Sequence, residues 1–175
     1  MKLEILFSGI GGQGVITAGE TICEAANKTG LNVTFVPFYG QEKRGGRTMC
    51  NIVLSDKMES PIISEANLML IFDERSLKEY QDLMAEDGIL IMSDMIDMEP
   101  TCKCAKAVKI PFYRLAQELG NSKAANVIAL GYVAKYLPQI PLDIIAEEIA
   151  NSFAKKPKLI PMNLEALKIG YNYND

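Results

Sequence analysis

The feature that most constrains the fold is a glycine-rich loop set between an apolar run and a helical segment near the start of the chain. The apolar run covers Lys2 to Phe7, and the loop follows as Gly9-x-Gly11-x-x-Gly14. Residues from Val15 to Thr29 are helix-forming, and a second apolar run, Asn32 to Phe38, predicts another strand. The stretch between the two strands is long enough for a parallel crossover, so the sequence predicts an opening strand–helix–strand unit with a parallel pair of strands.

The rest of the chain continues to alternate between short apolar runs and helical patterns. This alternation predicts an α/β fold: a three-layer Rossmann-like sandwich with a mostly parallel central sheet and a helical C-terminal third. We expect one domain over residues 1–175, since this length is close to a common domain size. The further strands are expected at Thr48–Leu54, Asn67–Phe72, Ile89–Met92 and Ala107–Ile110, and the helices at Leu77–Ala85, Tyr113–Leu119, Lys123–Leu137, Leu142–Phe153 and from near Asn163.

Composition excludes several classes of function. The 18 basic and 22 acidic residues give a net charge of −4, which argues against binding nucleic acid or a membrane surface through bulk charge. No apolar run reaches the roughly 18 residues that a membrane-spanning helix needs, so we expect no membrane insertion and a cytoplasmic location. The four cysteines include no Cys-x-x-Cys pair and the chain has no histidine, so spacing supports neither a metal site nor a histidine-based catalytic scheme.

The glycine loop itself has two open interpretations. Glycines between a strand and a helix let the backbone approach a phosphate at the helix N-terminus, or they only permit tight packing of the helix on the strand. A dinucleotide site would also want an acidic residue at the end of the second strand, and Phe35 to Phe38 offers none. The sequence therefore disfavours NAD binding.

A second loop carries an unusual density of positive charge for an acidic protein. Lys43, Arg44 and Arg47 fall within five residues beside the Gly45–Gly46 pair, after the second predicted strand. The loops that follow two parallel strands leave the sheet at one edge, so we expect this loop and the glycine loop to face one cleft. Such a cleft would bind an anionic group through arginine, with Glu42 orienting it, while a solvated charged loop is the plainer alternative.

Together these loops resemble a known family. Ser8–Val15 and the pattern Tyr39-Gly40-x-Glu42-x-Arg44-Gly45-Gly46 are similar to the gamma subunit of 2-oxoacid:ferredoxin oxidoreductases. Within that family, Glu42 in the loop resembles the 2-oxoglutarate type more than the indolepyruvate type. The similarity covers nearly the whole chain through Ser60–Pro61, Ile110–Pro111, Ala116–Asn121, Ala125–Asn126, Leu130–Gly131 and Asn163-x-x-Ala166-Leu167.

The resemblance implies a subunit without a redox centre of its own. Alpha and beta partner subunits would carry thiamine diphosphate, magnesium and 4Fe-4S clusters, a ferredoxin-like delta subunit would often accompany them, and ferredoxin would accept the electrons. This chain would help to bind coenzyme A at a shared cleft without catalytic or metal-binding residues of its own. The residues expected at the cleft are Gly9, Gly11, Gly12, Gln13, Gly14, Tyr39, Glu42, Arg44, Gly45, Gly46, Arg47 and Asn126.

Two alternatives remain open from the sequence. The chain could be a purely structural assembly subunit, whose two loops dock onto the catalytic subunits and touch no cofactor. A stand-alone nucleotide-binding domain is a third interpretation, which the missing acidic residue after the second strand disfavours.

Overall fold

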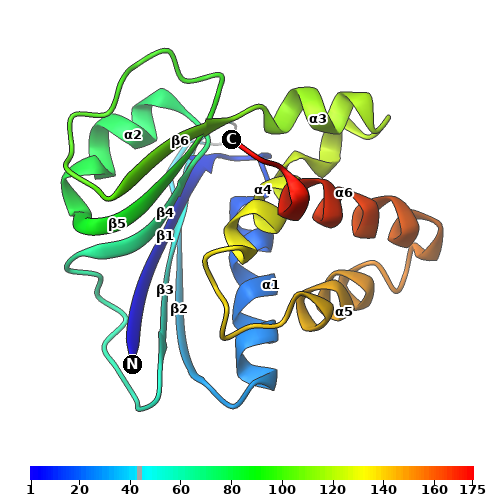
Figure 1. The fold of residues 1–175 in the computed structure, drawn as a ribbon, viewed down its shortest axis with the longest axis horizontal. Coiled ribbons are helices and arrows are strands. Elements are labelled where there is room, and N and C mark those ends of the chain that lie inside the picture. The colour runs from blue at the N-terminus through cyan, green and yellow to red at the C-terminus, as the bar shows by residue number, and fades with distance from the viewer. Residues whose placement is uncertain (43–44) are drawn as a thin grey trace.

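The computed structural model describes residues 1–42 and 45–175 of the chain. A six-stranded sheet lies at the centre, with α2 on one face and α1, α4, α5 and α6 on the other (Figure 1). This arrangement confirms the expected three-layer α/β sandwich and its helical C-terminal third. The strands are β1 (Lys2–Ile10), β2 (Asn32–Tyr39), β3 (Arg47–Ser55), β4 (Ala66–Ile71), β5 (Met84–Ser93) and β6 (Lys106–Ile110). The helices are α1 (Val15–Lys28), α2 (Glu74–Tyr80), α3 (Phe112–Glu118), α4 (Ala125–Ala134), α5 (Leu142–Ser152) and α6 (Ile160–Asn172), with short 3-10 turns at Gln81–Leu83, Ser122–Ala124 and Pro157–Leu159.

The sheet is mostly parallel, in the order β2-β3-β1-β4-β5-β6, and among the described strands β3 alone runs opposite to the other five. The predicted pairing of the first two strands is therefore wrong. After β2 the chain turns back through a hairpin, so β3 pairs antiparallel with β2 on one side and with β1 on the other. Because both β1 and β2 run opposite to β3, they still point the same way, and the loops after them leave at the same edge.

A second difference concerns β5, which starts at Met84 and not at the predicted Ile89. The pair Asp87–Gly88, which precedes the predicted strand, therefore lies inside the observed one. Met84 pairs with Ala66 and Ile89 with Leu68. The residues between Met84 and Ile89 therefore form a bulge in β5, which accommodates Gly88.

Apolar side chains fill both faces of the sheet, which explains why its inner strands are continuous apolar runs. In β1, Ile5 and Phe7 belong to the core under α1 and α4, while Leu6 belongs to a smaller core under α2. The edge strand β2 is less covered, and Phe38 near its end is 47% exposed. Within the described residues, no helix is long and apolar enough to cross a membrane.

Candidate functional site

The candidate site lies at the edge of the sheet where β1, β2 and β4 end. The helix after β1 packs on one face of the sheet and the helix after β4 packs on the other, and such a change of direction opens a crevice in which α/β proteins usually bind ligands (Figure 1). The glycine loop and the hairpin after β2 meet here, since the Gly11 N–H donates to the Gly46 carbonyl oxygen at 2.7 Å. The two loops are therefore neighbours, as the strand directions predict.

The side chain of Gln13 holds the glycine loop in shape. Its Oε1 accepts a hydrogen bond from the Ile10 N–H at 2.7 Å, and its Nε2 donates to the Tyr113 hydroxyl at 2.8 Å. A Cβ on Gly9 would lie 2.5 Å from the same Oε1, so Gly9 must be glycine for Gln13 to fit. Both polar ends of the Gln13 amide are engaged inside the protein.

Gly14 and Asn126 form a second internal contact, at the start of α1. Gly14 has a φ of 74°, and a Cβ there would lie 2.3 Å from Asn126 Nδ2. The Asn126 amide donates to the Gly14 carbonyl oxygen at 3.3 Å, which fixes α4 against the beginning of α1. Gly9, Gln13, Gly14 and Asn126 thus build the loop, in keeping with the packing interpretation of these positions.

The loop also uses some of the N–H groups that a phosphate would need. The Gly11 N–H is bonded to Gly46, and the Gln13 N–H donates to the Ile10 carbonyl oxygen at 3.2 Å. Gly12 differs from its neighbours, because it is exposed with a φ of 97° and has open space around its Cβ position. Gly12 is therefore an exposed loop glycine whose Cβ position is not blocked by any neighbouring atom.

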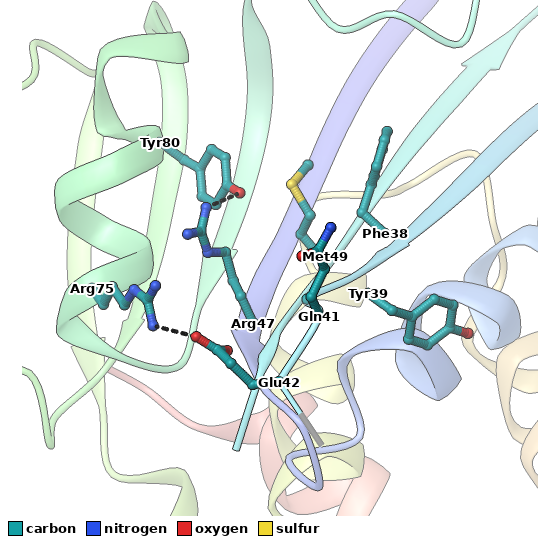
Figure 2. A pocket seen from close by; sticks show the side chains of 9 residues that line it. Phe38, Tyr39, Gln41, Glu42, Arg47, Met49, Arg75 and Tyr80 are labelled. Carbon is teal, nitrogen blue, oxygen red and sulfur yellow. Dashed lines mark hydrogen bonds and ion pairs between the residues drawn. The ribbon is translucent and has the colours of Figure 1, made fainter. Parts of the chain in front are cut away.

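A cleft of about 530 Å³ opens between the hairpin and α2. Figure 2 shows Phe38 and Met49 on the strands, Tyr80 and Arg75 on α2, and Tyr39, Gln41 and Glu42 at the hairpin. A second hollow of about 410 Å³ adjoins it, and the two share Tyr39, Gly40, Glu42 and Arg47. The second hollow adds Gly11, Gly45, Gly46 and Thr48 to its lining.

Arg47 is the first residue of β3 and reaches across to α2. It forms an ion pair with Glu79, and its Nη1 lies 3.4 Å from the Tyr80 hydroxyl. Its Nε–H is buried and has no hydrogen-bond partner among the described residues. Burial raises the pKa of Tyr80, although Arg47 and Arg75 act in the opposite direction, so the phenol stays neutral beside Arg47.

Arg75 and Glu42 form the other charged pair of the cleft. Their closest charged atoms lie 3.6 Å apart, and both side chains are more than half exposed. Glu42 was predicted to orient Arg44, but Lys43 and Arg44 lie outside the described residues. Among those described, the partner of Glu42 comes from α2.

The contribution of α2 to one side of the cleft was not predicted from the sequence. Arg75 and Tyr80 follow β4, and parallel strand direction alone would have put the start of that helix at the same edge. Asp73 caps the start of α2, since its carboxylate accepts from the Ser76 N–H at 3.0 Å. Two guanidinium groups, a phenol and apolar walls suit binding and positioning of an anionic ligand with an apolar part.

Comparison with known proteins agrees with this architecture. A model of the pyruvate ferredoxin/flavodoxin oxidoreductase family matches residues 4–173, and the chain belongs to this family. Ketoisovalerate oxidoreductase subunit VorA of Methanothermobacter thermautotrophicus is 32% identical over 97% of this chain and 36% of its own length. The 2-oxoglutarate synthase subunit KorC of Methanocaldococcus jannaschii is 29% identical over 98% and 93% of the two chains. The common gamma subunit of pyruvate/ketoisovalerate oxidoreductases of Thermococcus kodakarensis is 30% identical over 87% of each.

Solved structures share the fold. The gamma subunit of a keto/oxoacid ferredoxin oxidoreductase from Geobacter sulfurreducens has a TM-score of 0.81 at 24% identity, over 97% of this chain and 96% of that one. A 2-oxoglutarate:ferredoxin oxidoreductase from Magnetococcus marinus, solved with 2-oxoglutarate, coenzyme A and succinyl-CoA, has a TM-score of 0.87 at 24% identity, over 97% of this chain and 30% of that one.

The resemblance to gamma subunits of oxidoreductase complexes is confirmed by these relatives. The chain spans only about a third of VorA, so in some relatives this unit is one part of a longer polypeptide. The relatives are named for different 2-oxoacids, and family membership therefore leaves the substrate open.

Proposed function

We propose that this chain is the gamma subunit of a 2-oxoacid:ferredoxin oxidoreductase and contributes a binding cleft to the assembled enzyme. The reaction would be oxidative decarboxylation of a 2-oxoacid with coenzyme A, which yields acyl-coenzyme A, carbon dioxide and two electrons on ferredoxin, or its reverse. Alpha and beta subunits would hold thiamine diphosphate, magnesium and 4Fe-4S clusters, with a ferredoxin-like delta subunit beside them.

The observation that carries this proposal is the cleft between the hairpin and α2. Coenzyme A has phosphates at one end and a long, weakly polar arm, and the cleft pairs Arg47 and Arg75 with the walls Phe38, Tyr39 and Met49. Arginine binds phosphate through parallel N–H bonds, and the apolar walls would cover the organic part of the ligand. Coenzyme A is also bound in the Magnetococcus enzyme named above, which supports the choice of ligand.

Within this proposal the predicted residues have different roles. Gly11, Gly12, Tyr39, Glu42, Gly45, Gly46 and Arg47 would face the ligand, together with Arg44 of the same loop. Four other residues would act indirectly, by holding the glycine loop against α3 and α4: Gly9, Gln13, Gly14 and Asn126. None of these residues is proposed to make or break a bond.

The proposal can be tested on the complex purified anaerobically through a tag on this chain. We expect thiamine-binding and iron–sulfur subunits to copurify and to reduce a viologen dye with coenzyme A and one 2-oxoacid. Arg47→Ala should raise the KM for coenzyme A about tenfold, while the matched control Arg114→Ala, on the exposed side of α3, should leave it unchanged.

The main alternative is a purely structural subunit. In that case Arg47→Ala and Arg44→Ala would leave the KM for coenzyme A unchanged in an intact complex, and their effects would appear as loss of partner subunits. A chain that emerges alone, without activity, and binds a nucleotide tightly would instead favour a stand-alone binding domain.

We further propose 2-oxoglutarate as the substrate, from the form of the loop around Glu42. The dye assay tests this with 2-oxoglutarate, pyruvate, 2-oxoisovalerate and indolepyruvate side by side. A higher kcat/KM on any of the other three acids would replace that assignment without affecting the role of the cleft.

A further inference from the structure

We infer that Arg75 is the second anion-binding residue of the cleft, and that Glu42 occupies it as an internal competitor which the ligand's anionic group displaces. This inference rests on the proposed function, because it concerns regulation of the same cleft. It assigns a role to a residue of α2, outside the glycine loop and the hairpin, and it makes Glu42 a competitor of the ligand where the sequence predicted an orienting residue.

The two ion pairs of the cleft differ in how firmly they are held. Arg47 and Glu79 are 30% and 35% exposed, join β3 to α2, and have the Tyr80 hydroxyl beside them. Arg75 and Glu42 are 58% and 52% exposed, and their charged atoms are 3.6 Å apart, which is longer than a good charge-assisted hydrogen bond. An exposed ion pair of this kind contributes little to stability, so it is the pair that a ligand can open.

The hairpin holds Glu42 at the mouth of the cleft. The Gly40 N–H donates to the Arg47 carbonyl oxygen at 2.6 Å, and Gly46 is tied to the glycine loop through Gly11. The carboxylate of Glu42 rests over these two glycines: Cβ atoms would lie 3.2 Å from its Oε2 at Gly46 and 3.5 Å from it at Gly40. The glycines therefore leave room for this carboxylate, and Figure 2 shows it directed at the Arg75 guanidinium.

Charge explains why displacement is needed. Each described arginine of the cleft, Arg47 and Arg75, is matched by a carboxylate, Glu79 and Glu42, so the four charges sum to zero. A phosphate gains most from a guanidinium that has no other anion, because the fork of N–H groups can then hold two phosphate oxygens. Release of Glu42 frees Arg75 and leaves the more buried Arg47–Glu79 pair in place.

Single substitutions in the complex distinguish competition from a simple structural contact. If Glu42 competes with the ligand, Glu42→Gln should lower the KM for coenzyme A, by roughly threefold to tenfold, whereas Arg75→Ala should raise it by about tenfold. The double variant should behave like Arg75→Ala, because without Arg75 there is nothing for Glu42 to block. Inorganic pyrophosphate, as a competitive inhibitor against coenzyme A, should change its inhibition constant in the same directions.

Three other outcomes would each overturn the inference. If Glu42→Gln and Arg75→Ala shift the KM in the same direction, the pair is a structural latch and the inference fails, even where Arg47→Ala still supports the coenzyme A cleft. If Arg75→Ala has no effect while Arg47→Ala does, Arg75 lies outside the binding site. If none of the three has any effect in an intact complex, the proposed cleft fails together with the inference.

Discussion

Glu4 is a carboxylate buried in the sheet, and it stabilises a loop far away in the sequence. It is 4% exposed on β1, its Oε2 accepts from the N–H groups of Ser64 and Glu65 at 3.0 Å each, and its other oxygen pairs with Lys2. Burial by itself raises the pKa of Glu4, but the hydrogen bonds from Lys2 and the two N–H groups outweigh it and hold the pKa below its ordinary value. The charged form therefore anchors the segment that leads into β4.

We predict that Glu4→Gln lowers the free energy of unfolding by about 1–3 kcal/mol at pH 7, the usual scale for a buried hydrogen bond to a charged group. The folded-state pKa is lowered, so this stabilisation is present above the unfolded pKa, roughly 4.3, and is lost as the pH falls through the folded value. Urea unfolding at pH 7 and pH 3.5 should show a difference that shrinks in acid. Glu65→Gln, an exposed neighbour, is the control, and a difference independent of pH would refute the explanation.

The residues of the candidate site were only partly predictable. The loops could be found because glycine and arginine are unusual in these positions, and the strand directions brought them together. No local pattern indicates that Gln13 binds Tyr113, because that contact joins residues 100 positions apart. Nor could spacing tell that Arg75, in a helix with an ordinary composition, faces Glu42 across the cleft.

At the scale of elements, periodicity located most strands and helices, and pairing was the weaker part of the prediction. The helix predicted over Val15–Thr29 is α1, Val15–Lys28, because its apolar spacing and the following Gly30 fix both ends. The order of strands depends on long-range packing, which no local pattern encodes, and β3 accordingly came to lie between two strands that had been expected to pair. The start of β5 was predicted too late, at Ile89, because the strand accommodates Gly88 in a bulge.

Two glycines let α4 and α6 pack with their backbones in close contact. A Cβ on Gly131 would lie 2.1 Å from the Leu167 carbonyl oxygen, and one on Gly170 would lie 1.8 Å from that of Ile128. Alanine usually stabilises a helix by about 1 kcal/mol relative to glycine, but a backbone atom cannot move aside as a side chain can. The close approach should therefore dominate.

We predict that Gly131→Ala and Gly170→Ala each lower the free energy of unfolding by roughly 1–3 kcal/mol, the usual range for overpacking. The measurement is chemical denaturation followed by circular dichroism. Lys168→Ala, on the exposed side of α6, serves as the control and should change stability by less than about 0.5 kcal/mol. If either alanine variant were more stable than the original protein, the two helices would be able to move apart without a cost in free energy.

For the whole molecule, the absence of histidine removes the side chain that normally titrates near neutral pH. Several carboxylates have a lowered pKa in the fold because cations or N–H groups pair with them, among them Glu4, Asp56 and Glu74. Hydrogen bonds from Lys106 and Tyr132 lower the pKa of Asp175 to about 2. Glu24 is the exception, since burial and then the nearby Glu148 raise its pKa.

These shifts predict a particular dependence of stability on pH. Groups with a lowered pKa contribute stability that is complete above their unfolded values, near pH 4, and is lost as the pH falls toward 2, whereas Glu24 has the opposite sign and offsets only part of the loss. The free energy of unfolding should therefore be nearly constant from about pH 6 to 7.5 and decrease steadily below about pH 4.5. Urea unfolding across pH 3 to 8 measures this curve, and Asp175→Asn should flatten its lowest part. A slope between pH 6 and 7.5 would show instead that a carboxyl with a raised pKa, such as Glu24, titrates in the folded protein at neutral pH.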